Sequence, residues 1–374
     1  MDDQGNEDAG LSAPKEALRR ERLAAVAVAV VLVLSATAGV MIAHELRTAS
    51  HSVAGPGSRG SPTATAVSPA LVDISVSFTY DGSSGAATGI VVSPEGEVLT
   101  NNHVIDGATP VTATDIGDGR TYTATVVGYA PSIDIAVLQL QGATGLATAR
   151  LGDSSKVAVG DAVRGIGNAG GAGGTPAIAR GTVASLDQSL AATDGSGVAT
   201  ELLSGLIEVN ADIQPGDSGG PLIDNRDRVI GVNTAGSGPE IHPPRTYAVP
   251  INQALSTARQ IESGQGSTTV HVGPSAFLGV RVSVTGSPGA LGSGGPPSTG
   301  LRVGDVVGGA AAEKAGLGPG DLITALDGRP VRSAAGLRAI VLRLHPHDVV
   351  SIAWTDNGGH TRISSVELGS GPPT

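Results

Sequence analysis

Cysteine is absent from this chain of 374 residues, and aromatic side chains make up only 2% of it. Without cysteine there can be no disulfide bond and no thiolate metal site, which is compatible with an exported protein whose core suffices without bridges. Because aromatic residues are so few, the cores have to be built from Val, Ile, Leu and Ala, which suits β-rich packing. Basic residues are outnumbered by acidic ones, and the formal net charge of −11 argues against nucleic acid as a partner.

The N-terminal part of the sequence predicts a membrane anchor. Residues 1–22 are polar and mix acidic with basic side chains, so we expect a disordered tail. Residues 23–43 carry no charge, and a helix of that length spans roughly 30 Å, the thickness of a bilayer core. The arginine cluster before this helix places the N-terminus in the cytoplasm and the rest of the chain outside. A cleaved signal peptide is the alternative, but the long apolar run favours an uncleaved anchor over it and over a buried soluble helix.

The rest of the chain is long enough for two domains. Short apolar runs begin near residue 70 and are separated by Gly, Pro, Asp and Ser, a pattern typical of an all-β barrel or sandwich. Residues 250–262 are predicted to form a helix that closes the first domain. The predicted segments are a flexible linker at 44–69, the first domain at 70–262, a second linker at 263–275, a second domain at 276–368 and a tail at 369–374.

One segment, Gln214–Leu222, carries the main chemical signal, because Ser218 stands among the glycines at 216, 219 and 220. A nucleophilic serine needs a neighbouring base and a site for the oxyanion, and the glycines let the backbone turn sharply. An ordinary tight turn would show the same local pattern. The segment also fits the nucleophile elbow of α/β-hydrolases such as lipases and esterases, but in that fold the acid and the histidine follow the serine.

The other two candidate catalytic residues precede the serine. His103 lies in the segment Thr100–Val104, and Asp134 lies 31 residues further on and 84 residues before Ser218. The order His, Asp, Ser is that of the chymotrypsin-like proteases, in which the first barrel supplies base and acid and the second supplies the nucleophile. This order disfavours the esterase alternative.

At these residues the chain resembles the trypsin-like serine proteases and, within them, the HtrA (Deg) family. The resemblance implies a chymotrypsin-like double β-barrel that needs no metal or cofactor. It also implies His103 as general base, Asp134 as its orienting carboxylate, Ser218 as nucleophile, and an oxyanion hole made by the N–H groups of Gly216 and Ser218. The segments that carry the resemblance are Thr88–Val91, Leu99–Val104, Asp134–Leu138, Gly165–Asn168 and Gly216–Pro221.

Substrate contacts are expected on both sides of the nucleophile. Asp212 falls where the base of the S1 pocket lies in trypsin-like enzymes, and a polar residue on the pocket rim is the alternative. The segment containing Asn233, Thr234 and Ala235 is expected to pair with the substrate backbone as a strand. Asp217, which is asparagine in many HtrA proteases, is expected to pair with an arginine or to reach solvent. The glycine-rich run 165–174 lacks a following Lys-Ser/Thr, so it predicts a loop beside the active site and no phosphate site.

The second domain resembles a PDZ domain of the HtrA type, a small α+β fold. The resembling segments are Phe277–Val280, Ala311–Leu317 and Gly320–Val331. The resemblance implies that the backbone N–H groups of Leu278, Gly279 and Val280 receive the C-terminal carboxylate of a peptide that adds to the sheet as a strand. A PDZ-shaped spacer that binds nothing is the alternative.

The sequence as a whole predicts a mainly β, membrane-anchored serine endopeptidase of HtrA type with its domains outside the cytoplasm. Its expected substrates are misfolded or unfolded proteins, with peptide C-termini recognised by the PDZ domain. A homotrimer is implied only by the resemblance. The competing hypothesis is a latent protease that acts mainly as a peptide-binding chaperone or envelope-stress sensor.

Overall fold

The computed structural model describes residues 67–78, 82–193, 199–236, 245–282 and 300–373. The predicted tail at 1–22, the predicted membrane helix at 23–43 and nearly all of the linker at 44–69 lie outside these residues. Among the residues described, no helix is both long and apolar enough to cross a bilayer.

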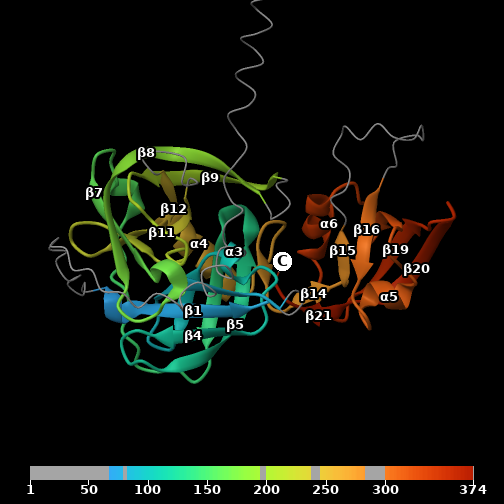
Figure 1. Cartoon of the computed structure of the whole chain (residues 1–374), viewed down its shortest axis with the longest axis horizontal. Helices are drawn as coiled ribbons and strands as arrows, with labels where there is room; N and C mark the ends of the chain where they lie inside the picture. Colours follow the sequence, from blue (N-terminus) through green and yellow to red (C-terminus); the bar gives the residue numbers. More distant parts are fainter. Residues whose placement is uncertain (1–66, 79–81, 194–198, 237–244, 283–299, 374) are drawn as a thin grey trace, which may run out of the picture.

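The first half of the first domain is a β-barrel (Figure 1). Its sheet has the strand order β13-β5-β4-β1-β2-β3-β6, and pairing of β5 with β6 closes it. Alternation explains the packing: Val72, Ile74 and Val76 of β1 point into the barrel, while Ser75 and Ser77 are exposed. The strands are β1 (Leu71–Ser77), β2 (Ser84–Val91), β3 (Glu97–Thr100), β4 (Val111–Asp115), β5 (Thr121–Ala130), β6 (Ile135–Leu140) and β13 (His271–Val272), which comes from the predicted second linker.

The second half is a closed six-stranded barrel in the order β10-β11-β12-β9-β8-β7. Helix α4 (Ile251–Glu262) follows it at the predicted place. The apolar face of α4, with Ile251, Ala254, Ala258 and Ile261, is buried in a core that residues of both barrels share. The strands are β7 (Ala162–Gly167), β8 (Ala177–Thr193), β9 (Ala199–Val209), β10 (Pro221–Ile223), β11 (Val229–Gly236) and β12 (Thr246–Pro250). Short helices lie in both halves of the domain: η1 (Ser68–Ala70), α3 (Asn102–Ile105) and η2 (Pro131–Ile133) in the first, and η3 (Ser154–Lys156) and η4 (Ala169–Gly171) in the second.

The second domain is a small sheet with two helices and its own core around Trp354. Its strand order is β15-β16-β17-β19-β20, with β18 beside β17, so β15 lies at an edge of the sheet. A further pair, β14 with β21, joins the two ends of the domain. The elements are β14 (Ser275–Phe277), β15 (Val280–Val282), β16 (Leu301–Val306), α5 (Ala311–Ala315), β17 (Leu322–Leu326), β18 (Arg329–Pro330), α6 (Ala334–Val341), β19 (Val349–Thr355), β20 (Thr361–Glu367) and β21 (Gly369–Gly371).

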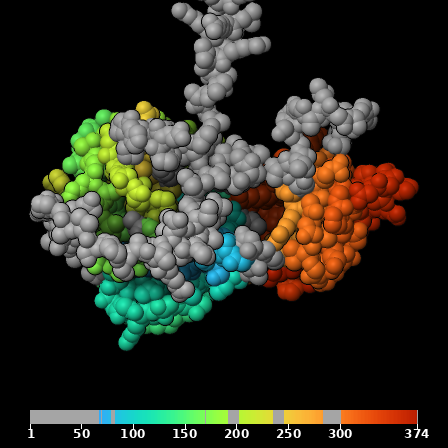
Figure 2. Space-filling model, in the orientation of Figure 1, coloured from blue at the N-terminus to red at the C-terminus, as the bar shows by residue number. Residues whose placement is uncertain are grey.

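The two domains touch through α6 and the segment around β13, and they lie side by side in Figures 1 and 2. Arg338 of α6 pairs with Asp106 of the first barrel at 2.8 Å. The ring of His271, which is buried, lies 2.8 Å (Nδ1) from the carbonyl oxygen of Leu342 and 3.1 Å (Nε2) from that of Pro274. Helix α6 and the turn after it are therefore fixed against the first domain, and Asp106 lies three residues after His103.

Candidate active site

His103 and Asp134 lie together in the first barrel. His103 is on the one-turn helix α3 directly after β3, and Asp134 stands between η2 and β6. The Nδ1 atom of His103 is 2.8 Å from Oδ2 of Asp134, and the backbone N–H of His103 donates to Oδ1 at 2.9 Å. The carboxylate therefore favours a proton on Nδ1, which leaves Nε2 as the acceptor nitrogen. Asp134 is buried while the His103 side chain is 43% exposed, so the pair presents its imidazole outward.

Asp134 is held in an unusual backbone conformation. Its φ of 56° lies in the left-handed region, which few non-glycine residues adopt. Its carbonyl oxygen accepts a hydrogen bond of 2.8 Å from Nδ2 of Asn101. Its Oδ2 also accepts a hydrogen bond from the hydroxyl of Thr234, in β11 of the second barrel. The carboxylate is thus fixed from both barrels, and Asp134 directly precedes β6.

Thr234 also connects this pair to Ser218. The hydroxyl of Ser218 donates to the carbonyl oxygen of Thr234 at 3.3 Å. Thr234 belongs to the segment expected to pair with the substrate backbone. Its side chain is buried, and its hydroxyl is directed to Asp134. Local sequence gives no signal for this role, because it requires two residues 100 positions apart to meet.

The loop around Ser218 turns sharply at its glycines. Gly216 has a φ of 100° and Gly219 a φ of 81°, values that side-chain-bearing residues rarely adopt. A side chain at Gly219 would also collide, since an added Cβ would lie 2.1 Å from the carbonyl oxygen of Thr88. Within the described residues, the N–H groups of Gly216 and Ser218 donate to no protein acceptor. They are therefore available to stabilise a negatively charged oxygen.

Asp217, next to the nucleophile, is buried and has no cation partner among the described residues, so the expectation of an arginine partner or solvent contact was wrong. Its Oδ2 accepts a hydrogen bond of 2.9 Å from the N–H of Gln214, while its Oδ1 has no hydrogen-bond partner. Burial raises the pKa of Asp217 to about 6, and the negative charge of Asp212 acts in the same direction while the Gln214 hydrogen bond opposes it.

The predicted substrate-contact residues lie in different environments. Asp212 is exposed and accepts a hydrogen bond from the Gln214 side chain, which is the geometry of a surface residue. Asn233 is fully buried, and its main chain pairs with Gly219 and Gly220. Beyond Asn233, β11 pairs with β12 on one side, and the other side is paired with no strand among the described residues. Residues 234–236, including Ala235, therefore offer a strand edge beside Ser218.

The predicted carboxylate-binding loop of the PDZ domain leads into the edge strand β15. Gly279 has a φ of 78°, and an added Cβ there would lie 2.2 Å from Cβ of Ala310, so a larger residue does not fit. The carbonyl oxygens of Leu278 and Gly279 are held by the N–H groups of Ala312 and Val307. Val280 starts β15, which pairs with β16 on one side. The other side of β15 pairs with no strand in the part of the chain that the structure describes.

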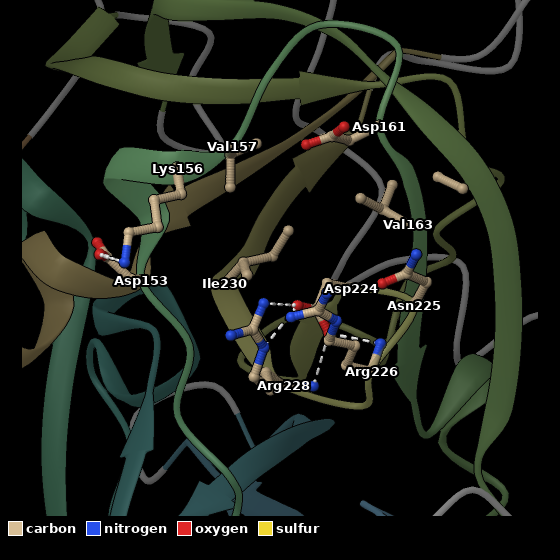
Figure 3. Close-up of a pocket in the computed structure, with 11 residues that line it drawn as sticks. Asp153, Lys156, Val157, Asp161, Val163, Asp224, Asn225, Arg226, Arg228 and Ile230 are labelled. Carbon is tan, nitrogen blue, oxygen red and sulfur yellow. Dashed lines mark hydrogen bonds and ion pairs between the residues drawn. The ribbon is translucent and has the colours of Figure 1, made fainter.

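A separate pocket of about 240 Å³ lies on the second barrel (Figure 3). Its charged groups largely neutralise one another: Lys156 pairs with Asp153 at 3.1 Å, and Arg228 pairs with Asp224 at 2.7 Å. None of His103, Asp134 and Ser218 lines it, and its lining carries no nucleophile with a neighbouring base. The candidate catalytic residues come from the two barrels and lie outside this pocket.

A double β-barrel with a His–Asp pair on one barrel and a glycine-flanked serine on the other defines the class of trypsin-like peptidases. Comparison with known proteins agrees: residues 87–232 match the trypsin-like peptidase domain and residues 276–364 match the PDZ domain. All three candidate catalytic residues lie inside the first match.

Curated relatives of the chain are named as serine proteases. The chain is 32% identical to the serine protease PepD of Mycobacterium tuberculosis over 319 residues, covering 81% of this chain and 64% of PepD. It is 35% identical to the periplasmic serine endoprotease DegP of Escherichia coli over 254 residues, covering 67% of this chain and 50% of DegP. A solved structure of the HtrA-type protease AlgW with a decapeptide is 25% identical, covers 82% of this chain and 97% of that chain, and has a TM-score of 0.46.

The chain thus spans between half and two thirds of the length of these curated relatives. It combines a trypsin-like peptidase domain with a PDZ domain and resembles the HtrA-type serine proteases, which confirms the prediction from its motifs.

Proposed function

We propose that this protein is a serine endopeptidase of HtrA type that degrades unfolded or misfolded proteins. The observation that carries the proposal is the contact of 2.8 Å between His103 and Asp134, in a trypsin-like domain whose glycine-rich loop presents Ser218. In this proposal Ser218 is the nucleophile, His103 the general base and Asp134 the residue that orients the imidazole.

The reaction proceeds by acyl transfer. Ser218 Oγ attacks the scissile carbonyl carbon as His103 Nε2 takes the hydroxyl proton, and Asp134 stabilises the imidazolium that forms. The N–H groups of Gly216 and Ser218 bind the oxyanion of the tetrahedral intermediate. His103 then gives the proton to the leaving amine, and a water molecule, activated by the same imidazole, hydrolyses the acyl-enzyme.

Substrate is held mainly through its backbone. An extended segment adds to the free edge of β11 at residues 234–236, beside the nucleophile. Such pairing reads main chain more than side chain, which suits unfolded proteins of varied sequence. Peptide C-termini bind the PDZ domain by adding to the edge strand β15, with their carboxylate at Leu278, Gly279 and Val280.

The cellular setting is part of the proposal. Residues 23–43 anchor the protein in the cell membrane with its N-terminus in the cytoplasm, so both domains act outside the cytoplasm in protein quality control under stress. This setting is supported by the uncharged run itself and by the periplasmic location in the name of the relative DegP. A homotrimer is proposed on the resemblance alone.

A latent enzyme that acts mainly as a peptide-binding chaperone is the second candidate. It is favoured by one observation, the hydrogen bond of 3.3 Å that directs the Ser218 hydroxyl to the carbonyl oxygen of Thr234. A serine in that hydrogen bond has to rotate before its proton can pass to His103.

Turnover of unfolded casein by the purified full-length chain, beside Ser218→Ala, separates the candidates. We expect cleavage by the wild type and none by the variant, with a fluorophosphonate probe labelling only the wild type. Absence of cleavage and of labelling in the wild type, with and without peptides that have free C-termini, would contradict the peptidase and favour the chaperone.

A further inference from the structure

We propose that Thr88, on β2 of the first barrel, is a positioning residue that holds the oxyanion loop of the second barrel in its reactive shape. The inference rests on the proposed peptidase function and assigns part of its rate to a side chain outside the triad and the oxyanion hole. Thr88 is fully buried and lies 128 residues before Gly216.

The main chain of Thr88 ties the nucleophile to the first barrel. Its N–H donates to the carbonyl oxygen of Ser218 at 2.9 Å. Its own carbonyl oxygen accepts a hydrogen bond of 2.9 Å from the hydroxyl of Thr100, on β3. Because β2 and β3 are neighbours in the barrel, Ser218 is fixed to a rigid sheet through this residue.

The hydroxyl of Thr88 bridges two loops of the second barrel. It accepts a hydrogen bond of 2.8 Å from the N–H of Asn168 and donates one of 2.8 Å to the carbonyl oxygen of Gly216. The directions are fixed, since an N–H can only donate and a carbonyl can only accept. The single hydroxyl proton is therefore committed to Gly216.

This bond matters because it fixes the peptide unit between Gly216 and Asp217. The carbonyl of that unit is bound by Thr88, and its N–H donates to the carbonyl oxygen of Gln214 at 3.0 Å. The preceding carbonyl, of Pro215, accepts from the N–H of Gly170 at 2.8 Å. Both peptide units around Gly216 are thus fixed, and with them the direction of the Gly216 N–H. Glycine at a φ of 100° has little steric resistance to turning, so these bonds have to supply the restraint.

Glycines surround Thr88 where side chains would collide with it. An added Cβ at Gly167 would lie 2.8 Å from the Thr88 hydroxyl oxygen, and one at Gly219 would lie 2.1 Å from its carbonyl oxygen. At Gly220 the added Cβ would meet the Thr88 methyl group at 3.2 Å. Three glycines therefore leave the space in which one threonine reaches both loops.

The test compares Thr88→Val, which keeps the shape and removes the hydroxyl, with Thr88→Ser, which keeps the hydroxyl. Removing an oxyanion donor outright lowers kcat by about 10²–10³ in such enzymes, so releasing the loop that carries one should lower it by about 10- to 100-fold. KM for a peptide substrate should stay within about twofold, because the loop acts on the transition state more than on substrate binding. Thr88→Ser should recover kcat to within about threefold of wild type.

Two further readouts separate positioning from a merely structural role. The inhibition constant of a peptide boronic acid, which forms a tetrahedral adduct, should rise in parallel with the fall in kcat. Thr257→Val, in α4, is the matched control: Thr257 is also buried, and its hydroxyl donates to the carbonyl of Gln253 at 3.1 Å, away from the site. It should lower the melting temperature and leave kcat unchanged.

The outcomes are distinguishable. If the wild type does not cleave, the peptidase function itself fails. If the wild type cleaves and Thr88→Val matches it in kcat, or if Thr88→Ser falls as far as Thr88→Val, the assignment of the hydroxyl is wrong. Should Thr88→Val not fold, Thr88→Ala and Thr88→Ser give the same comparison, since they differ only by the hydroxyl.

Discussion

Replacing Asp217 by asparagine tests the buried carboxyl beside Ser218. Asparagine keeps the size of the side chain and the oxygen that accepts from the N–H of Gln214, but it cannot ionise. Burial raises the pKa of Asp217 from 3.8 to about 6. That difference corresponds to about 3 kcal/mol by which the ionised carboxyl destabilises the folded protein at neutral pH.

Because the pKa of Asp217 is raised in the folded protein, its carboxyl destabilises the fold more at neutral pH than at acidic pH. Above about pH 6 the carboxyl is ionised in both the folded and the unfolded protein, so the folded state bears the full cost. As the pH falls from about 6 towards 4, the folded protein takes up its proton before the unfolded protein does, and the cost is relieved. The free energy of unfolding of Asp217→Asn, measured relative to that of the wild type, should therefore fall by about 2 kcal/mol between pH 7.5 and pH 4.5.

Calorimetry of full-length chains carrying Ser218→Ala, which prevents self-cleavage, gives the measurement. Calorimetry is needed because Trp354, the only tryptophan, lies in the PDZ domain and does not report on the protease domain. The unpaired amide hydrogens of the new asparagine add a penalty of about 1–3 kcal/mol, but that penalty is the same at both pH values. The change with pH is therefore the diagnostic quantity.

A matched control is Asp161→Asn. Asp161 also accepts a hydrogen bond from the N–H three residues before it, that of Ala158 at 2.9 Å, but it is exposed. The reasoning fails if the stability gap between Asp217→Asn and its parent is constant with pH or widens on acidification. It fails equally if the stability difference between Asp161→Asn and its parent falls by the same amount on acidification.

Two further substitutions test the site and its link to the PDZ domain. Asp134→Asn should lower kcat by about 10⁴ with little change in KM, because an amide that donates to Nδ1 of His103 favours the wrong tautomer; a loss of less than tenfold in steady-state assays would contradict the role of Asp134. Arg338→Met removes the 2.8 Å pair with Asp106 and should weaken docking of the PDZ domain by about 1 kcal/mol. The linker at 263–270 should then be cut about fivefold faster by an added protease, and an unchanged rate would show that the pair does not hold the domains together.

Local sequence was sufficient for the architecture of the first domain and for the barrel on which each candidate catalytic residue lies. The short apolar runs correspond to strands, and the helix predicted at 250–262 is α4. The order and spacing of His103, Asp134 and Ser218 predicted that the first two lie on one barrel and the serine on the other, and the structure has them there. These features depend on patterns within single segments, which a sequence displays directly.

The contacts that complete the site depend on residues far apart in the chain, and they could not be predicted. In the sequence, Thr88 and Thr234 cannot be told from other strand residues, since threonine is common in strands. The environment of Asp217 was misjudged for the same reason: whether a carboxyl beside the nucleophile meets solvent, a cation or neither is decided by how the barrels close over it.

The segment around Ser218 cannot fix its own conformation. Glycines at 216 and 219 allow the sharp turn, but they do not stabilise it over the many other conformations of a flexible loop. The observed conformation is stabilised by the first barrel, where Thr88 binds Gly216 and Ser218. Asn168 and Gly170, which follow β7, stabilise it as well. The proposed oxyanion hole thus depends on both barrels, and any change that shifts one barrel against the other should lower the turnover rate before it unfolds either barrel.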